Sequence, residues 1–239
     1  MTKLVVNIDK VATLRNARGG NTPDLLKAAA DCQTFGAEAI AVHPRPDGRH
    51  VLYEDVLALR NVVCTEFHIE GYPSKEFVEL VQKAKPTQVT LVPDAPDAKS
   101  SSAGWNVEAN SDFLREVIDE LQPYGIRVAI FIDANPASVI SAAKVGADRV
   151  QLFTEPYAAL FAQDCQAAIA PFLNAAKVAR ETGLGVNAGH GLNAQNLPFL
   201  HQQIDWLKEV SVGHALIADA LYEGMENAIN RYKDCLKDK

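Results

Sequence analysis

The sequence lacks the features that are typical of membrane, secreted and zinc-binding proteins. No apolar run approaches the roughly 20 residues that a helix needs to span a bilayer, and the first residues lead into a short strand pattern without the long apolar region of a signal peptide. The four cysteines are widely scattered, with no CxxC pair and no Cys/His spacing typical of a zinc site. We therefore expect a cytoplasmic protein with reduced thiols, no membrane segment and no metal.

Positive charge is also in deficit, with 23 basic side chains against 30 acidic ones and a net charge of −7. This balance argues against a nucleic-acid-binding protein. The charge is unevenly distributed: residues 10–50 carry a balance of +2, residues 1–9 balance to zero, and the remainder carries −9. A locally basic segment in an acidic chain fits a small anionic substrate, for which phosphate is the usual group. The alternative is an uneven surface without a function.

The chain has the size and composition of one large globular domain covering residues 1–239. It has no obvious linker, and 48% of its residues are hydrophobic, which is enough for a sizeable core. Helical patterns alternate with short apolar runs; the first follows a polar loop that reaches residue 22, and the last covers residues 215–236. The runs that we expect to form strands are residues 4–8, 39–42, 67–69, 88–92, 127–132, 149–153, 184–186 and 206–212.

Buried parallel strands are typically short continuous apolar runs of this kind. Eight strand–helix pairs in a chain of this length predict an α/β fold, a single-domain (β/α)8 TIM barrel with parallel strands and an extra helical turn near residues 157–161. Gly36 and Gly146 are each followed by an alanine and an acidic residue. This repetition indicates a recurring helix-to-strand turn.

Polar and charged residues follow the predicted strands, where the catalytic groups of such barrels lie. In chain order they are Asn7, Asp9, Lys10, Arg15 and Arg18; His43, Arg45 and His50; Glu70; Ser100; Asp133; Thr154 and Glu155; His190 and Gly191; and Gly213 and His214. Imidazoles, carboxylates and phosphate-type donors at one mouth favour acid/base chemistry on a phosphorylated small molecule.

Each of these groups also has a purely structural interpretation. Glu70 could be the ion-pair partner of a neighbouring arginine, and Asp9 and Asp133 could cap helices. Arg15 and Arg18 could share one helical turn, so that only one of them faces the site. The loop at residues 93–110 is the longest stretch without a regular pattern, and we expect it to act as a lid over the bound substrate.

Five motifs together make the chain recognisable over nearly its whole length. They are NIDKVATLRNARG at 7–19, VHPRPDGRH at 42–50, FIDA at 131–134, VNAGHGL at 186–192 and VGHA at 212–215. In this order they resemble the pyridoxine 5′-phosphate synthase family. The resemblance implies a transferase-type synthase that condenses 1-deoxy-D-xylulose 5-phosphate with 3-amino-2-oxopropyl phosphate. It also implies that no cofactor or metal is needed, and that the chain forms a homo-octamer.

The resemblance further implies a role for individual residues. His43 and Glu70 would accept protons, and His190 would donate one. The residues implied for 3-amino-2-oxopropyl phosphate are Asn7, Arg18, Gly191, Gly213 and His214, and those implied for 1-deoxy-D-xylulose 5-phosphate are Asp9, Lys10, Arg45, His50 and Ser100.

Two of these positions depart from the family pattern, because Lys10 replaces the usual histidine and Ser100 replaces the usual threonine. A lysine can meet a phosphate as a point charge but does not shuttle protons like histidine at neutral pH. Three other functions stay open from the residues alone. They are a phosphosugar aldolase or isomerase, a metal-dependent hydrolase and a binding module without catalytic activity.

Overall fold

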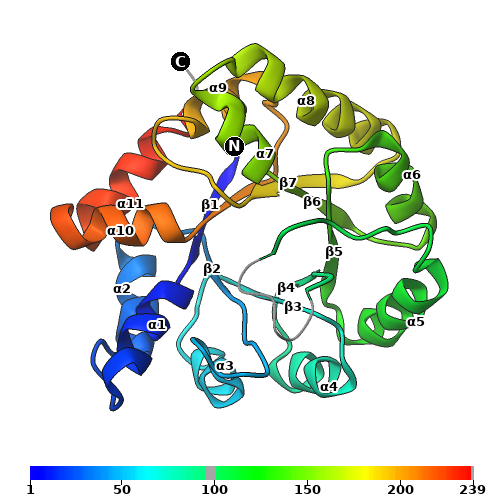
Figure 1. Ribbon diagram of the computed structural model, residues 1–239. Coiled ribbons are helices and arrows are strands. Elements are labelled where there is room, and N and C mark those ends of the chain that lie inside the picture. Colours follow the sequence, from blue (N-terminus) through cyan, green and yellow to red (C-terminus); the bar gives the residue numbers. More distant parts are fainter. Residues whose placement is uncertain (95–100, 238–239) are drawn as a thin grey trace.

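The computed structural model describes residues 1–94 and 101–237, so Ser100 and part of the predicted lid lie outside the described residues. Eight parallel strands close into a barrel in chain order, with the last strand paired to the first. Figure 1 shows these strands at the centre and the helices around them. The strands are β1 (Lys3–Asn7), β2 (Ala39–Val42), β3 (Glu66–Gly71), β4 (Gln88–Leu91), β5 (Arg127–Ile132), β6 (Arg149–Phe153), β7 (Gly185–Gly189) and β8 (Glu209–Val212). The predicted (β/α)8 fold is confirmed.

The connections between the strands are helical. The helices are α1 (Asp9–Arg18), α2 (Leu25–Thr34), α3 (Tyr53–Leu59), α4 (Lys75–Ala84), α5 (Ser111–Leu121), the 3-10 turn η1 (Gln122–Tyr124), α6 (Pro136–Lys144), α7 (Glu155–Phe161), α8 (Cys165–Glu181), α9 (Leu197–Gln203), α10 (His214–Glu223) and α11 (Met225–Asp234). The expected extra turn near residues 157–161 is confirmed as α7. All four cysteines are free, and no helix of the described chain has the length and hydropathy to cross a membrane.

Two helix predictions were wrong for identifiable reasons. The polar loop expected after the first strand contains α1, whose buried side includes Asp9 and Arg15 as well as Val11 and Ala12. Polar residues on the buried side hide the apolar period that marks an amphipathic helix. The single helix expected at residues 215–236 is two helices, because Gly224 interrupts it with a φ of 81°.

The barrel strands alternate rather than forming uniformly apolar runs. Leu4, Val6 and their counterparts on the other strands belong to the main core cluster, which also contains the helix side chains. The intervening positions are largely polar, and they make hydrogen bonds between strands that are not neighbours, such as Asn187 of β7 to Gln88 of β4. Only side chains inside a closed barrel can make such contacts. The apolar core therefore lies between the strands and the helices, whereas the barrel interior is largely polar.

The repeated helix-to-strand turn is confirmed in detail. Gly36 and Gly146 adopt φ values of 102° and 90°, which a side chain would disfavour. The acidic residue of each turn then accepts a hydrogen bond from a neighbouring strand: Leu4 N donates to Glu38 at 2.9 Å, and Val128 N donates to Asp148 at 2.8 Å. The carboxylates therefore satisfy a backbone donor at the N-terminal end of the barrel.

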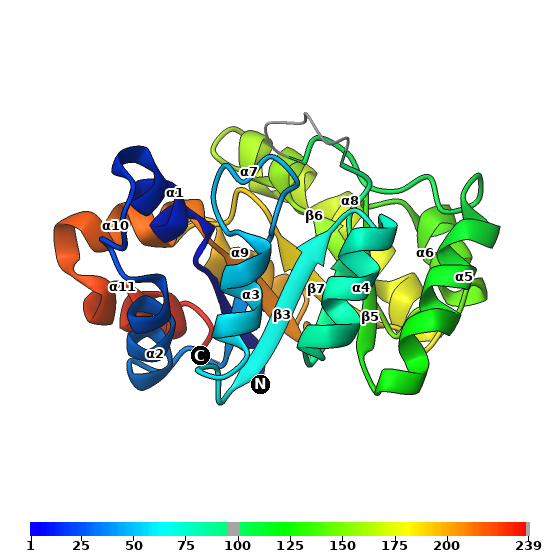
Figure 2. The same ribbon diagram turned by 90° about the horizontal axis from the view of Figure 1, so that it is seen from below.

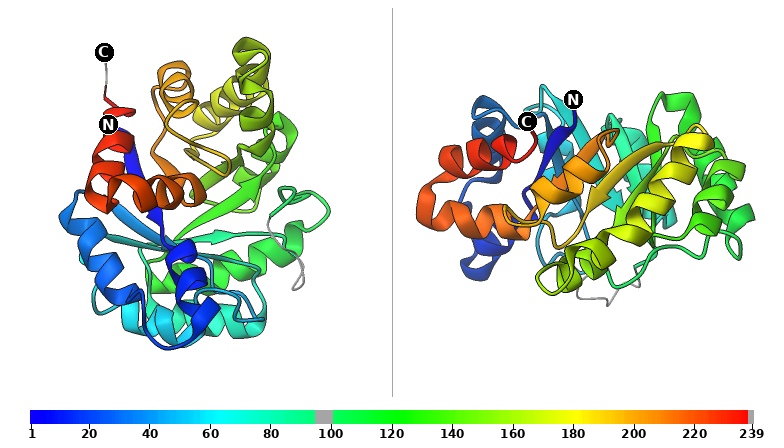
Figure 3. Two further views of the ribbon diagram at one scale, coloured as in Figure 1. Left: turned by 60° about the vertical axis from the view of Figure 1, so that its left-hand side comes forward. Right: turned by 90° about the horizontal axis from the view of Figure 1, so that it is seen from above.

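The two ends of the barrel are clearly distinguished in space. Figure 2 shows α1 and α7 at the end toward which β3 points, while the N-terminus lies at the opposite end, and the right-hand view of Figure 3 agrees. The loops that follow the strands, with the residues singled out above, therefore gather at one end. We call this end the mouth.

Candidate active site

Asp9 ties the ends of β1 and β2 together at the mouth. Its Oδ1 atom accepts a hydrogen bond of 2.9 Å from the backbone N–H of His43, and its Oδ2 atom accepts one of 3.0 Å from Asn7 Nδ2. His50 lies nearby, with Nδ1 at 3.8 Å from Asp9 Oδ1. The predicted alternative, a helix cap, is wrong because the side chain contacts other strand ends rather than the first turn of α1. Asp9 therefore fixes the backbone that carries His43.

Burial keeps the two imidazoles of the second strand end neutral. Desolvation, followed by the charge of Arg45, holds the pKa of His43 well below its usual range. The same two causes lower the pKa of His50 to about 4. The two rings approach edge to face, with centroids 6.3 Å apart. A neutral imidazole can accept a proton, which suits His43 to the part of a base.

Glu70 is the carboxylate whose protonation is most sensitive near neutral pH. It lies in β3, and Gln151 of β6 donates a hydrogen bond of 3.2 Å to its Oε1 atom across the barrel. Desolvation, aided by the negative charge of Asp9, raises the pKa of Glu70 to about 7. Within residues 1–94 and 101–237 it forms no ion pair. Glu70 can therefore gain and lose a proton at the working pH of most enzymes.

His190 occupies an unusual backbone conformation at the end of β7. Its φ is 89°, a region in which residues other than glycine are uncommon, and the buried Thr154 donates a hydrogen bond of 2.6 Å to its carbonyl oxygen. Its ring meets Phe131 and Phe153 edge-on, with centroids 5.9 Å and 5.4 Å away. Burial lowers the pKa of His190, and the negative charge of Glu155 opposes this effect. The ring is thus held in one place by both its backbone and its neighbours.

The ends of β7 and β8 offer backbone rather than side-chain groups. A Cβ atom on Gly191 would lie 2.7 Å from Glu155 Oε2, and one on Gly213 would lie 3.1 Å from Asn7 Oδ1. Side chains at these positions would therefore crowd Glu155 and Asn7, so both positions favour glycine. Gly213 immediately precedes α10, and the exposed His214 is the first residue of that helix. Free N–H groups at a helix N-terminus beside a glycine favour an anion.

The arginines of the basic segment have different surroundings. Arg15 forms two hydrogen bonds of 2.7 Å with the carboxylate of Asp55, so its role is structural. Arg18 is exposed in the last turn of α1, and Lys10 is exposed in the first turn. The expectation that only one of Arg15 and Arg18 faces the site is consistent with this arrangement, and Arg18 is the one that can reach a ligand.

Asp94, just beyond β4, is a site residue that we did not predict. It is buried and pairs with the equally buried Arg45, while Ser101 Oγ donates a hydrogen bond of 2.8 Å to the same carboxylate oxygen. A pocket of about 130 Å³ borders His43, Arg45, Tyr72 and Asp94. Gln151 was also missed. The sequence shows both as polar residues in or just after a predicted strand. It does not show that Asp94 contacts Arg45 or that Gln151 contacts Glu70.

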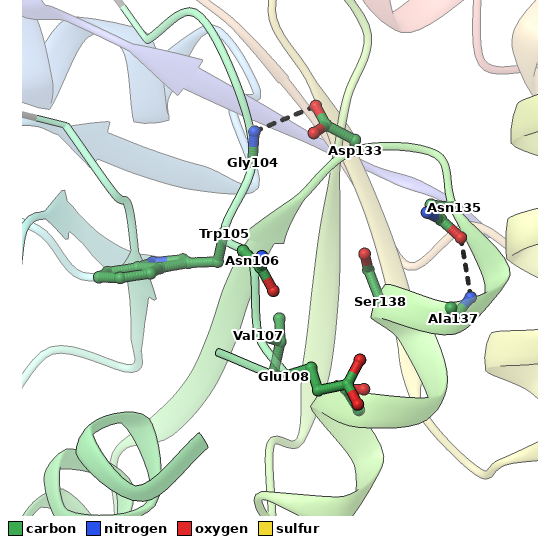
Figure 4. A pocket seen from close by; sticks show the side chains of 10 residues that line it. Gly104, Trp105, Asn106, Val107, Glu108, Asp133, Asn135, Ala137 and Ser138 are labelled. Carbon is green, nitrogen blue, oxygen red and sulfur yellow. Dashed lines mark hydrogen bonds between the residues drawn. The ribbon is translucent and has the colours of Figure 1, made fainter. Parts of the chain in front are cut away.

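Asp133 does not join the groups at the mouth. It is exposed and lines a separate polar pocket of about 300 Å³ between residues 104–108 and α6. Figure 4 shows its carboxylate accepting a hydrogen bond of 3.0 Å from the backbone N–H of Gly104, and Asn135 capping α6 at Ala137. Asp133 follows β5 as expected, but its side chain secures the neighbouring loop instead of joining the proposed acid/base groups.

The described part of the predicted lid packs against the barrel. Trp105 is buried, its backbone N–H donates to Phe131 O at 2.9 Å, and its indole N–H donates to Leu91 O at 3.1 Å. A Cβ atom on Gly104 would lie 2.2 Å from the backbone nitrogen of Asp133. Gly104 and Trp105 therefore pack closely against the ends of β4 and β5, and the lid at residues 93–110 stays a prediction.

Metal-type ligands do not gather among the described residues of the mouth. Among the described residues, three such side chains come within 4.8 Å of one another at the opposite end of the barrel. They are Glu66, His68 and Glu209. Arg127 and Arg149 already occupy the carboxylates of this grouping. Those charges are neutralised by guanidinium groups, so this geometry supports an ion-pair network rather than a metal centre.

Comparison with known proteins gives a consistent result over the whole chain. Residues 4–238 match the family described as "Pyridoxal phosphate biosynthesis protein PdxJ". The chain is 59% identical over 237 residues to the pyridoxine 5′-phosphate synthase of Phocaeicola vulgatus, covering 99% of this chain and 100% of the relative. It is 58% identical over 236 residues to the enzyme of the same name from Parabacteroides distasonis, covering 99% of each.

Solved structures resemble the protein in fold alone. The thiamine phosphate pyrophosphorylase of Pyrococcus furiosus superimposes with a TM-score of 0.64 at 15% identity, over 98% of this chain and 95% of that one. The phosphoribosylanthranilate isomerase of Thermotoga maritima superimposes with a TM-score of 0.63 at 13% identity, over 99% and 98% of the two chains. At such identities the likeness supports the barrel architecture only.

Proposed function

The chain belongs to the pyridoxal phosphate biosynthesis protein PdxJ family and is an enzyme, and from this premise we propose that it condenses 1-deoxy-D-xylulose 5-phosphate with 3-amino-2-oxopropyl phosphate. The products are pyridoxine 5′-phosphate, inorganic phosphate and water. Besides the similarity to these relatives, one observation supports the proposal. Glu70 has a pKa of about 7 and lies at the mouth with the imidazoles and the phosphate-type donors.

The reaction needs several groups that exchange protons near neutral pH. Imine formation, elimination of phosphate and ring closure with loss of water each move protons on or off carbon, nitrogen or oxygen. In our proposal His43 and Glu70 accept protons, and His190 donates one. The neutral imidazole of His43 and the raised pKa of Glu70 support the first two roles. Glu155 supports the third by opposing the loss of the proton from His190.

The ends of the first two strands would hold 1-deoxy-D-xylulose 5-phosphate. Asp9 and His50 lie together there, Arg45 supplies a guanidinium, and Lys10 lies exposed on the rim. Ser100, the fifth residue assigned to this substrate, lies outside the described residues. Charged donors on adjacent strand ends suit a sugar phosphate, because cations meet the phosphate while a carboxylate accepts from hydroxyl groups.

The adjoining part of the mouth, where β7 and β8 end beside β1, would hold 3-amino-2-oxopropyl phosphate. Asn7 lies against Gly213, and Gly213 immediately precedes the N-terminus of α10. His214 opens α10, so the positive end of that helix faces the same region. Arg18 would add a charge from α1. Two anion sites of different construction thus match two phosphorylated substrates.

Incubation with both substrates tests the proposal directly. We expect pyridoxine 5′-phosphate and one equivalent of inorganic phosphate, with neither formed when one substrate is left out. Because we also propose that no metal or cofactor takes part, a chelator should leave the rate unchanged. We further propose a cytoplasmic homo-octamer, which light scattering of the purified protein tests. Absence of product from the folded protein would contradict the proposed substrates.

A further inference from the structure

Arg45 already contacts an anion of the protein itself. Its Nη2 atom pairs with Asp94 Oδ2, and the two side chains are 6% and 5% exposed. Ser101 Oγ donates to the same Asp94 oxygen at 2.8 Å. The pair is thus an internal carboxylate–guanidinium contact of the strong, charge-assisted kind, removed from bulk water. It occupies the side chain that the proposed function assigns to a substrate phosphate.

A carboxylate and a phosphate bind a guanidinium through the same kind of contact. Two anions at one guanidinium repel each other, and at low dielectric this repulsion is larger than in water. We propose that Asp94 is a positioning residue that acts as an internal counter-anion of Arg45, which the phosphate of 1-deoxy-D-xylulose 5-phosphate must displace, so that Asp94 sets the affinity for that substrate. This inference rests on the proposed function of Arg45.

The surroundings of the pair fit an exchange of partners. The pocket of about 130 Å³ borders both Arg45 and Asp94, so the two side chains adjoin a space that is not tightly packed. Arg45 is buried, and a carboxylate beside it lowers the cost of keeping its charge away from water before substrate binds. Ser101 donates to the carboxylate oxygen that Arg45 contacts, so Asp94 keeps a hydrogen-bond donor after it releases Arg45.

The same carboxylate also influences the proposed acid/base groups. The negative charge of Asp94 raises the pKa of Glu70 and opposes the lowering of the pKa of His190. A phosphate placed on Arg45 would bring further negative charge to this region. Asp94 therefore links the anion site to the proton-transfer groups, a link that a residue serving only the packing of the loop would not make.

The variant Asp94→Asn tests this role because it keeps the shape of the side chain and removes its charge. Loss of one negative charge beside the guanidinium favours an added anion, whatever other contacts Arg45 makes. We expect calorimetry to show about tenfold tighter binding of inorganic phosphate, the size of effect that about 1.4 kcal/mol produces. The KM for 1-deoxy-D-xylulose 5-phosphate should fall similarly, while the KM for 3-amino-2-oxopropyl phosphate stays within twofold.

Two further variants serve as matched controls. Asp31→Asn makes the same change in an exposed aspartate that pairs with Lys27 on α2, and should leave phosphate affinity unchanged. Ser101→Ala removes the second contact of Asp94 but not its charge, and should change phosphate affinity by less than twofold. Unchanged or weaker phosphate binding by folded Asp94→Asn would overturn the inference.

The wild-type protein provides an independent test if Asp94→Asn does not fold. A crystal structure with bound inorganic phosphate should show Arg45 in contact with the phosphate and no longer with Asp94. Retention of the Arg45–Asp94 contact beside a phosphate bound elsewhere would overturn the inference. If the wild-type enzyme makes no pyridoxine 5′-phosphate, the proposed function fails instead. The phosphate-binding measurements still decide the role of Asp94 in that case.

Discussion

The two ends of the barrel use the same kinds of side chain in opposite ways. At the N-terminal end, Arg149 pairs with Glu209 at 2.6 Å, Arg127 pairs with both Glu209 and Glu66, and Lys3 also contacts Glu66. These pairs join strands that are not neighbours, through the barrel interior. Both Glu66 and Glu209 thus have a cation in contact. We call this set of pairs the basal network.

The acidic groups at the mouth have fewer partners of opposite charge. His68, together with Lys3 and Arg127, holds the pKa of Glu66 well below its usual range. Burial instead raises the pKa of Glu70 to about 7, although only four positions separate the two glutamates in β3. The difference teaches that the partner, not the residue type or the strand, decides whether a carboxylate stabilises the fold or exchanges protons.

The substitution Glu70→Gln should produce the largest effect on catalysis. Glutamine keeps the shape and the contact with Gln151 but cannot accept a proton. We expect kcat to fall by roughly 10²–10⁴, with both substrates still bound at nearly normal affinity. Single-turnover assays measure the chemical step, and calorimetry on the same variant measures binding.

Glu66→Gln in the same strand is the matched control for Glu70→Gln. Because Glu66 belongs to the basal network, this change should lower stability and leave kcat per folded molecule within about twofold. If Glu70→Gln kept more than a tenth of wild-type turnover, Glu70 would be structural, and His43 would become the leading base. The two ends of the barrel would then differ in the burial of their carboxylates but not in catalytic function.

Removing the central carboxylate of the basal network should produce the largest effect on stability. Glu209 is 1% exposed and contacts Arg127 and Arg149, and Asn187 donates to it at 2.9 Å. Breaking a buried pair from one side leaves charge without compensation, so Glu209→Gln should lower the free energy of unfolding by about 3–5 kcal/mol. Urea denaturation followed by circular dichroism measures this loss.

A surface pair supplies the control for Glu209→Gln. Asp31 pairs with Lys27 on the exposed side of α2, where side chains are 38% and 71% exposed. Water screens such a pair, so Asp31→Asn should cost less than about 1 kcal/mol. Equal losses in the two variants would mean that burial contributes nothing to the basal network, contrary to the contrast drawn here.

The two anion sites of the mouth should respond separately to loss of their arginines. Arg18→Ala should raise the KM for 3-amino-2-oxopropyl phosphate, and Arg45→Ala the KM for 1-deoxy-D-xylulose 5-phosphate. Charge-assisted hydrogen bonds contribute about 1.5–3 kcal/mol, hence a rise of roughly ten- to a hundredfold. Initial rates with one substrate varied at a time measure each KM. Equal effects of both variants on both substrates would contradict the assignment.

Much of the fold could be predicted from the sequence because the relevant signals are local. The strands at 39–42, 127–132 and 149–153 have the predicted bounds, and the glycines of the helix-to-strand turns have the positive φ that their context indicates. The helix α1 could not be predicted in this way. Its buried side carries Asp9 and Arg15, and their burial is favourable only because Asp55 and the β2 end supply partners.

The candidate site could be predicted as a set of residues at strand ends, but their contacts could not. Glu70 was singled out by its place at a strand end, where burial raises its pKa to about 7. Asp94 and Gln151 were missed because their importance depends on Arg45 and Glu70, which are far away in the sequence. Asp133 lies at its expected strand end, but the contact of its side chain with Gly104 could not be predicted. Such pairings require the folded barrel.

The pH dependence of stability should have opposite signs at the two ends. The folded pKa of Glu70 lies above its ordinary value of 4.5, so its stabilising contribution is complete below pH 4.5 and is lost as pH rises through about 7. Ionised Glu66 stabilises the folded protein at pH values above its ordinary pKa. This contribution is lost only as the pH falls through the lowered pKa of Glu66 in the folded protein. The free energy of unfolding, measured with urea between pH 5 and 8, should therefore decline less with rising pH for Glu70→Gln than for wild type. An unchanged decline would contradict the raised pKa.

The smallest expected effect concerns the charge that faces His190. Glu155 is exposed at the start of α7, and its charge opposes the lowering of the pKa of His190, as does that of Asp94, whereas Arg45 and Lys10 favour the lowering. Glu155→Gln should therefore lower that pKa further. If His190 donates a proton, the acid limb of kcat should move to lower pH, because the lowered pKa of His190 lies below the pKa of about 7 of Glu70 and the lower pKa sets that limb. The shift should be less than about one unit because water screens an exposed carboxylate. The alkaline limb, set by Glu70, should stay in place. A shift of the alkaline limb alone would mean that Glu155 acts on Glu70, and that His190 is not the group that must hold a proton.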